Sequence, residues 1–229
     1  MRIIFVRHGH PDYKHDCLTE LGHKHAEAVA ERLREEHIER ICASSCGRAA
    51  QTAEHIARLQ NKEVETFDFM REIGWGTAEG EEIPHRGHPW SLAEDMIADA
   101  RTLMSSTWFA EDPFAHNTVT KNVRKVGENF DLWLADMGYV REGEYYRVTE
   151  PRYQTVAMVS HGGSSSAAIA HLFNLSFPFF CGTVHPDFTA ITIVSFEGEE
   201  GALITPRIEI MNDCRHIAGI DTPPKKTHK

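Results

Sequence analysis

The sequence predicts an α/β protein in which a mostly parallel central sheet lies between two layers of helices. Short apolar runs at residues 2–6, 41–43 and 156–159 have the length and composition of buried strands. A segment with helical periodicity follows each run, and this alternation is typical of a parallel sheet covered by helices. We therefore expect a three-layer α/β/α architecture.

The first third of the chain alternates regularly between strand and helix patterns. After the first strand, apolar residues recur at helical spacing over 26–33, with Thr19 as the expected cap and an end near His37. The strand at 41–43 precedes a second helix marked by the apolar positions of 49–59, and 64–69 reads as a third strand. This order indicates two strand–helix–strand units.

The middle of the chain interrupts this alternation. Glycine and proline punctuate residues 74–89, and two helical segments follow near 91–104 and 117–137. We interpret residues 77–137 as an insertion that covers the edge of the sheet and the candidate site, without a domain of its own. The prediction is thus a single domain over 1–218 and a flexible tail over 219–229.

The last third returns to strands and one helix. The strand at 156–159 is followed by a helix over 164–172. Segments 189–196 and 207–211 are expected to pair as a hairpin across the turn at 198–201.

Composition narrows the class of protein. The 229 residues include 24 basic and 34 acidic side chains, which gives a net charge of −10 and argues against non-specific binding of nucleic acid. No apolar run approaches the roughly 20 residues of a membrane-spanning helix. The five cysteines are scattered, which favours reduced thiols in a cytoplasmic protein. Fifteen histidines raise the question of metal binding, and nothing in the sequence predicts the oligomeric state.

Three clusters of polar residues stand directly after predicted strands. They are the segments at 7–9, 44–48 and 160–163, and each joins arginine or histidine to small residues. Ligands of open α/β sheets bind beyond the carboxyl ends of strands, and helix N-termini favour anions. Each cluster alone could lack a functional role, because a lone histidine is usually structural and a lone arginine is usually solvated. Their agreement predicts a phosphate site.

Together these motifs resemble those of the histidine phosphatase superfamily, the phosphoglycerate mutase-like proteins. Order and approximate spacing are similar along nearly the whole chain. The resemblance rests on Arg7-His8-Gly9, Leu18-Thr19 with Gly22, Ser44-Ser45 with Arg48-Ala49 and Gln51-Thr52-Ala53, Arg71-Glu72 with Gly76 and Glu79-Gly80, Ser160-His161-Gly162-Gly163, and Asn212-Asp213 with His216.

The resemblance implies a role for each matching residue. His8 corresponds to the nucleophile that takes the phosphoryl group. Arg7, Arg48 and His161 correspond to residues that bind the phosphate and neutralise its charge, with His161 also counted as catalytic. Glu72 corresponds to the proton donor for the leaving oxygen. No metal or other cofactor is implied, since these cations would stabilise the spread charge of phosphoryl transfer themselves.

Departures from the family pattern favour hydrolysis over mutase chemistry. His10 and Lys14 stand where many relatives carry an acidic or polar residue and a phosphate-contacting asparagine. The sugar-phosphate-binding sequence of true phosphoglycerate mutases is absent. We therefore expect a histidine acid phosphatase-type hydrolase that acts on a small phosphomonoester. The alternatives are a cofactor-dependent phosphoglycerate-type mutase and a non-catalytic module that binds a phosphorylated ligand.

Substrate choice is expected to depend on residues beside the phosphate. His10 follows the nucleophile motif, and His85 and Arg86 lie in the first loop of the insertion, where they could reach a second anionic group. The ordinary reading of that loop is an exposed polar surface. His85 and His88 have metal-ligand spacing, but no carboxylate or cysteine partner accompanies them, so no metal site is predicted.

Overall fold

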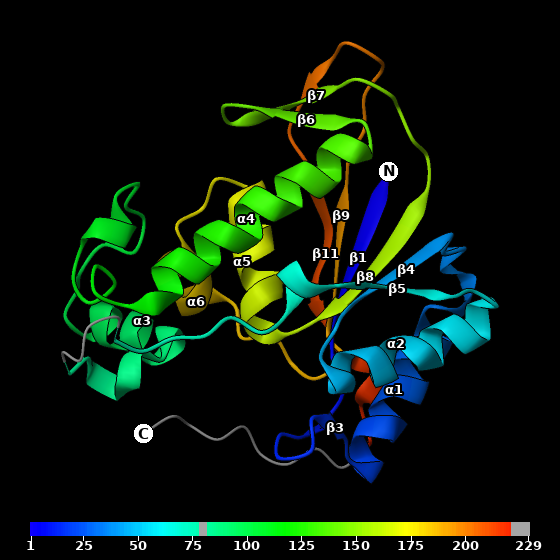
Figure 1. The fold of residues 1–229 in the computed structure, drawn as a ribbon, viewed down its shortest axis with the longest axis horizontal. Coiled ribbons are helices and arrows are strands. Elements are labelled where there is room, and N and C mark those ends of the chain that lie inside the picture. The colour runs from blue at the N-terminus through cyan, green and yellow to red at the C-terminus, as the bar shows by residue number, and fades with distance from the viewer. Residues whose placement is uncertain (78–81, 221–229) are drawn as a thin grey trace.

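The computed structural model describes residues 1–77 and 82–220. Six strands form the central sheet in the order β11-β9-β1-β8-β4-β5 (Figure 1). Strands β1, β8, β4 and β5 run parallel, whereas β9 is antiparallel to both of its neighbours, β1 and β11. The mostly parallel sheet is thus confirmed. The strands are β1 (Arg2–Arg7), β4 (Arg40–Ser44), β5 (Val64–Phe67), β8 (Thr155–Ser160), β9 (Ile191–Ser195) and β11 (Arg207–Asp213).

Helices cover both faces of this sheet. The pleat turns Ile4 and Val6 of β1 toward one face, where they join a core with residues of α1 and α2. Ile3 and Phe5 point to the other face and join a larger core with residues of α4 and α5. The long helices are α1 (Glu20–Arg32), α2 (Gly47–Gln60), α3 (Pro89–Ala98), α4 (Thr118–Asp136) and α5 (Gly162–Leu172), with a shorter α6 (Phe177–Thr183). The 3₁₀ turns are η1 (Arg34–Glu36), η2 (Asp68–Met70), η3 (Pro84–Gly87), η4 (Trp108–Ala110) and η5 (Arg215–Ile217).

The predicted insertion packs on the face of the sheet and not at its edge. The ring of Phe130 in α4 stacks on Phe5 of the central strand β1, with centroids 5.6 Å apart. Trp90 and Leu92 of α3 belong to the same core as this pair. The long apolar face of α4 explains the difference, because it needs the broad surface that a sheet's middle provides.

The local expectations differ in outcome. Thr19 caps α1, with its side-chain oxygen accepting the Gly22 N–H at 3.1 Å. The predicted helix at 91–104 is wrong in its extent, since α3 ends at Ala98 and Ala100 has a left-handed φ of 53°. Residues Glu79 and Gly80, and residues 221–229 of the predicted tail, lie outside the described residues.

The sequence did not predict five short strands that the described residues form outside the main sheet, nor α6. Strands β6 (Tyr139–Glu142) and β7 (Tyr145–Val148) form a hairpin that β10 (Leu203–Ile204) extends, and β2 (Pro11–Asp12) pairs with β3 (Cys17–Leu18). The expected β9–β11 pairing is present, but β10 interrupts its connection. Asp131 of α4 anchors the hairpin, because it pairs with Arg141 and accepts the Tyr146 hydroxyl, both at 2.8 Å.

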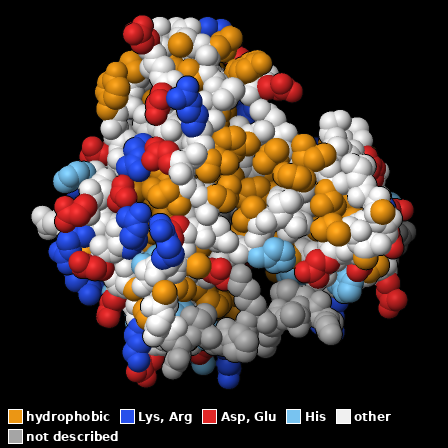
Figure 2. Space-filling view, turned by 180° about the vertical axis from the view of Figure 1, so that it is seen from behind, with side chains coloured by type: hydrophobic (Ala, Val, Ile, Leu, Met, Phe, Trp, Pro, Cys, Tyr) orange, Lys and Arg blue, Asp and Glu red, His pale blue; other side chains and the backbone are white. Residues whose placement is uncertain are grey.

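The surface mixes charges of both signs. On the face drawn in Figure 2, basic and acidic side chains are interspersed, and apolar side chains gather toward the middle. Among the described helices, none combines the length and the apolar character needed to cross a bilayer.

Candidate active site

The three predicted clusters meet at one end of the sheet. Strands β1, β8 and β4 are neighbours, so their carboxyl ends bring together the residues that follow them. His8 follows β1, and His161 follows β8, with 5.1 Å between their ring centroids. Arg48 comes from the first turn of α2, immediately after β4. Segments more than 100 residues apart thereby share one site.

His8 lies in a fully enclosed position, with 1% of its surface exposed. Its Nδ1 is 2.7 Å from the carbonyl oxygen of Gly9, and its Nε2 is 3.2 Å from Nε of Arg48. Because a guanidinium can only donate, Nε2 is the acceptor and the ring proton is on Nδ1. Burial, followed by the charge of Arg7, holds the pKa of His8 well below its usual range. The ring is therefore a neutral imidazole with a lone pair on Nε2.

Asp16 orients Arg48 and was missed by the sequence interpretation. Its Oδ1 pairs with Nη1 of Arg48 at 2.5 Å, and its Oδ2 accepts the Gly47 N–H at 2.8 Å. Burial alone would raise the pKa of Asp16, but these hydrogen bonds and the arginine charge lower it overall. The carboxylate thus ties the start of α2 to the loop after β1. Its left-handed φ of 50° has no clear sequence signal.

His161 supplies a hydrogen-bonding group more than a charge. Its Nε2 lies 2.8 Å from the hydroxyl of Ser44, and no partner for its Nδ1 occurs among the described residues. Burial, and then the charge of Arg48, lower the pKa of His161 to about 3. The predicted charge on this histidine is therefore absent at neutral pH in the unliganded protein, and the arginines carry the positive charge.

Arg7 lies against a segment that the sequence did not connect with the site. Its Nη1 donates to the carbonyl oxygen of Pro186 at 2.5 Å. The guanidinium carbon also lies 4.5 Å from the ring centroid of Phe188, which is cation–π distance. Gly162 also lies beside this guanidinium, since an added Cβ there would be 3.6 Å from Nε of Arg7, an ordinary van der Waals contact.

Glu72 lies at the N-terminus of α5. Its Oε1 accepts the backbone N–H groups of Gly163 at 3.0 Å and Ser164 at 3.3 Å. Burial raises the pKa of Glu72, although the charges of Arg7 and Arg48 oppose that shift. The predicted proton donor is therefore held in place and favours its protonated form relative to an exposed glutamate.

The predicted specificity residues are in different environments. His10 lies beside the site, with Nδ1 2.9 Å from the Thr19 hydroxyl and its ring 5.3 Å from that of Phe188. His85 pairs with Asp95 of α3 at 2.8 Å, and the adjacent Arg86 has a left-handed φ of 54°. Their contacts with a substrate stay predictions.

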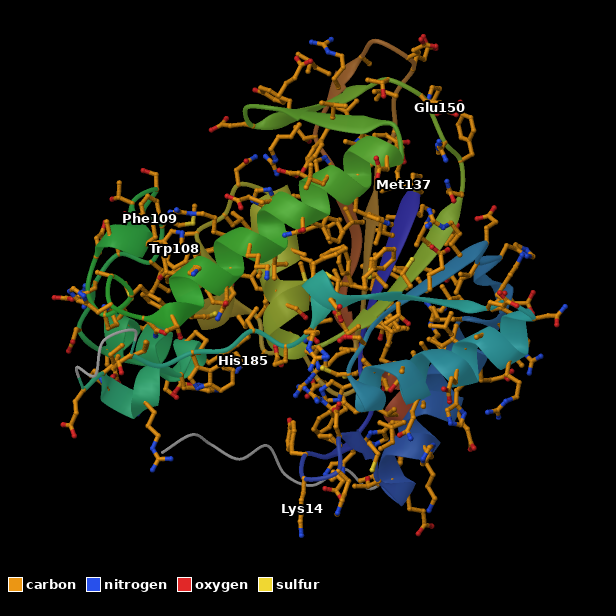
Figure 3. All side chains as sticks on the ribbon, in the orientation of Figure 1. Lys14, Trp108, Phe109, Met137, Glu150 and His185 are labelled. Atoms are coloured by element: carbon orange, nitrogen blue, oxygen red, sulfur yellow. The ribbon has the colours of Figure 1, made fainter. Side chains whose placement is uncertain are left out.

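Two other sequence expectations concern ligands at this site. Lys14, which stands near the family's phosphate-contacting position, is exposed and points away from the sheet (Figure 3). Across residues 1–77 and 82–220, no three histidine, cysteine, aspartate or glutamate side chains come together as a metal site.

Comparisons with known proteins agree with the motifs. Residues 3–102 match the model of the histidine phosphatase superfamily, branch 1. A putative phosphoserine phosphatase 2 of Hydrogenobacter thermophilus is 24% identical over 89% of this chain and 93% of its own length. A probable phosphoglycerate mutase of Proteus mirabilis is 34% identical over 36% of this chain, and the match spans 43% of that protein.

Solved structures share the fold over almost the full chain. A phosphoserine phosphatase from Entamoeba histolytica in complex with 3-phosphoglyceric acid has a TM-score of 0.63 at 21% identity, covering 94% of this chain and 98% of that one. A mycobacterial glucosyl-3-phosphoglycerate phosphatase with inorganic phosphate gives the same TM-score, identity and coverage. The sequence motifs, the family model matched by residues 3–102 and the shared fold thus agree that the chain is similar to the histidine phosphatase superfamily.

Proposed function

We propose that the protein is a phosphomonoester hydrolase in which Nε2 of His8 takes the phosphoryl group. One observation carries the proposal: a buried neutral imidazole presents its Nε2 lone pair to Arg48, between neighbouring strand ends. A neutral imidazole is a competent nucleophile near neutral pH. The match of residues 3–102 to the superfamily model and the phosphatase names of relatives support phosphatase activity in general.

The first half-reaction transfers the phosphoryl group to the enzyme. Nε2 of His8 attacks phosphorus, the bond from phosphorus to the ester oxygen breaks, and that oxygen leaves with the proton of the Glu72 carboxyl. The Nδ1 proton stays hydrogen-bonded to Gly9, which stabilises the positive charge that the ring gains. Arg7 and Arg48 stabilise the charge on the equatorial oxygens, and His161 supplies a hydrogen bond.

Water completes the cycle. The Glu72 carboxylate takes a proton from water, whose oxygen attacks phosphorus, and the bond from phosphorus to Nε2 breaks. Inorganic phosphate leaves, His8 returns to its neutral form, and Glu72 is again protonated. In this scheme the residues of the chain supply the nucleophile, the acid and the base, and no cofactor takes part.

We infer that the substrate is a small phosphorylated molecule. The relatives include proteins named for phosphoserine and glucosyl-3-phosphoglycerate, and one neighbour was solved with 3-phosphoglyceric acid. Small phosphorylated acids are therefore the first compounds to assay. His10, His85 and Arg86 stay our candidates for contacts beyond the phosphate, in a single domain over 1–218 that works in the cytoplasm.

The test is a panel of phosphomonoesters assayed with His8→Ala. O-phosphoserine, 3-phosphoglycerate and p-nitrophenyl phosphate should release phosphate with the unmodified protein, and His8→Ala should abolish that release. His116→Ala, which removes an exposed histidine of the insertion, is the control and should retain full activity. Alkaline quenching during turnover should trap phosphohistidine on the unmodified protein alone.

Other outcomes would point to the alternative functions. Isomerisation of phosphoglycerate with little released phosphate would identify a mutase, a function carried by the names of the partial matches such as that in Proteus mirabilis. Phosphate binding with no turnover of any ester would identify a non-catalytic module. Undiminished phosphate release by His8→Ala would refute the proposed nucleophile.

A further inference from the structure

The segment between α6 and β9 forms part of the wall of the site. We call residues 184–189 of this segment the Arg7 strap. They contact Arg7, which ends β1, and His8, which follows it. Pro186 accepts a hydrogen bond from the guanidinium of Arg7, and the ring of Phe188 lies against the same group. The strap therefore decides where the Arg7 guanidinium points.

The backbone of the strap is also bonded to the nucleophile's own strand. The N–H of Thr189 is 3.4 Å from the carbonyl oxygen of His8, and the N–H of Arg7 donates to Ala190 at 3.2 Å. Thr189 has a φ of 53°, which is a true outlier for a β-branched residue. Such a conformation persists only when its surroundings hold it.

Asn212, near the end of β11, holds the middle of the strap. Its Nδ2 donates to the carbonyl oxygen of His185 at 3.1 Å, and its Oδ1 accepts the N–H of Asp187 at 3.2 Å. These two residues flank Pro186. One amide side chain thus fixes the chain on both sides of the carbonyl group that Arg7 contacts.

His216, in η5, holds the end of the strap. Its Nε2 lies 3.0 Å from the hydroxyl of Thr189, the residue with the strained backbone. That hydroxyl donates to the carbonyl oxygen of Phe188 at 2.8 Å, so it is the acceptor for His216. Side chains of β11 and η5 therefore form hydrogen bonds to three of the six strap residues: His185, Asp187 and Thr189.

We propose that Asn212 and His216 are positioning residues that set the Arg7 guanidinium for phosphate by clamping the Arg7 strap. Their hydrogen bonds go to the strap and not to Arg7, so they act through the backbone on either side of Pro186 and through Thr189. A guanidinium already fixed in its bound orientation loses less freedom when the anion arrives. This inference rests on the proposed function only in giving Arg7 the role of a phosphate ligand.

The sharpest variant is Asn212→Gly. Asn212 has a φ of 52°, which glycine adopts without strain, so the substitution removes the clamp and leaves the local backbone conformation accessible. Asn174→Gly is a matched control, because Asn174 has a φ of 55° and bonds Arg141 and Glu144, which belong to the β6–β7 hairpin region. Asn212→Asp, which loses only the donor to His185, is a milder second variant.

The readouts are the affinity for inorganic phosphate, measured by titration calorimetry, and the KM and kcat for p-nitrophenyl phosphate. We expect Asn212→Gly to weaken phosphate binding and raise KM about 10- to 100-fold, the scale on which small misplacements of binding groups act. Asn174→Gly should leave both unchanged. Circular dichroism should show both variants folded at the assay temperature.

A double-mutant cycle with Arg7→Ala separates positioning from a general structural effect. In the Arg7→Ala background, Asn212→Gly should weaken phosphate binding no further, because the group that it positions is gone. An equal loss in both backgrounds, or unchanged binding by folded Asn212→Gly, would overturn the clamp.

The binding assay is independent of the reaction. If the unmodified protein binds phosphate but hydrolyses no ester, the proposed function fails and the clamp is still tested by the cycle. If esters are hydrolysed and Asn212→Gly binds phosphate normally, the clamp alone fails. Absence of phosphate binding by the unmodified protein would overturn the role of Arg7 as a phosphate ligand, and the clamp with it.

Discussion

For single residues, the same burial has opposite effects on the two titratable groups that the proposed reaction needs. Burial lowers the pKa of His8, which keeps its Nε2 unprotonated, and raises the pKa of Glu72, which extends the pH range over which its carboxyl is protonated. The unprotonated nucleophile and the protonated acid therefore coexist over a wider range of pH than free histidine and glutamate would allow.

Glu72→Gln tests this arrangement directly. Because the acid must be protonated, the rate of the unmodified protein should fall as pH rises through the raised pKa of Glu72. The amide cannot titrate, so this alkaline fall should vanish, and kcat for alkyl phosphates should drop by about 10²- to 10⁴-fold. The measurement is kcat against pH for O-phosphoserine. An unchanged alkaline limb would assign the acid to another residue.

At the residue scale, the sequence was informative about groups in short motifs and silent about groups that work through tertiary contact. The motifs located His8, Arg48 and Glu72. Asp16 was not predicted, because its partner Arg48 is 32 positions away and no sequence pattern indicates its left-handed backbone conformation. The hydrogen bond from Arg7 to the carbonyl oxygen of Pro186 was not predicted, because every residue has a backbone carbonyl and no side chain marks this one.

Among the secondary-structure elements, α5 combines structural and proposed chemical roles at its first turn. The free N–H groups of a helix N-terminus favour a carboxylate, and here they hold Glu72. Gly163 makes this possible. A Cβ at that position would come within 2.5 Å of both Oε1 of Glu72 and Cγ1 of Ile73. Position 163 therefore requires glycine, because Glu72 and Ile73 lie too close to leave room for a Cβ.

We therefore expect Gly163→Ala to displace the acid. Its kcat should fall toward that of Glu72→Gln, whereas phosphate affinity should change much less, because the nearest neighbours of the new methyl group are Glu72 and Ile73 and not Arg7 or Arg48. Alanine is intrinsically the better helix former by about 0.5–1 kcal/mol, so weaker helix propensity cannot explain a loss. Gly74→Ala, whose Cβ would meet only Asn122 at 3.5 Å, is the control. Equal kcat values for the two variants would contradict this reading of Gly163.

The success of the sequence interpretation also varied among elements. Strands with continuous apolar runs, such as β1 and β8, were predicted because both of their faces are buried. The β6–β7 hairpin was missed because arginine and glutamate alternate with its apolar residues, and tertiary contacts to Asp131 stabilise it. The position of α4 over the middle of the sheet depends on packing, which no local pattern encodes.

For the molecule as a whole, buried histidines link stability to pH. His8, His25 and His161 are almost fully buried, and burial lowers the pKa of each. Burial also lowers the pKa of His216, to about 4. Between the usual histidine value of 6.5 and these lower values, the unfolded chain binds protons that the folded chain does not. Stability therefore falls as pH decreases through this range.

His25→Leu should stabilise the protein, and more so in acid. His25 has no exposed surface, and neither ring nitrogen has a hydrogen-bond partner among the described residues. Leucine removes an unpaired polar group and also a proton acceptor of the unfolded state, a linkage worth about 1.4 kcal/mol per pH unit between the two pKa values. Urea unfolding at pH 5 and pH 8 measures both effects, with His116→Leu as the exposed control. A gain no larger at pH 5 than at pH 8 would contradict the linkage.

The position of the clamp in the sequence has a consequence for biosynthesis. Arg7 and His8 leave the ribosome about two hundred residues before Asn212 and His216, which hold the strap in the proposed clamp. A nascent chain that ends before β11 carries the nucleophile but leaves the strap unclamped. In the proposed scheme, full affinity for phosphate therefore arrives only with the last strand of the sheet, and the growing polypeptide binds phosphorylated molecules more weakly than the finished chain.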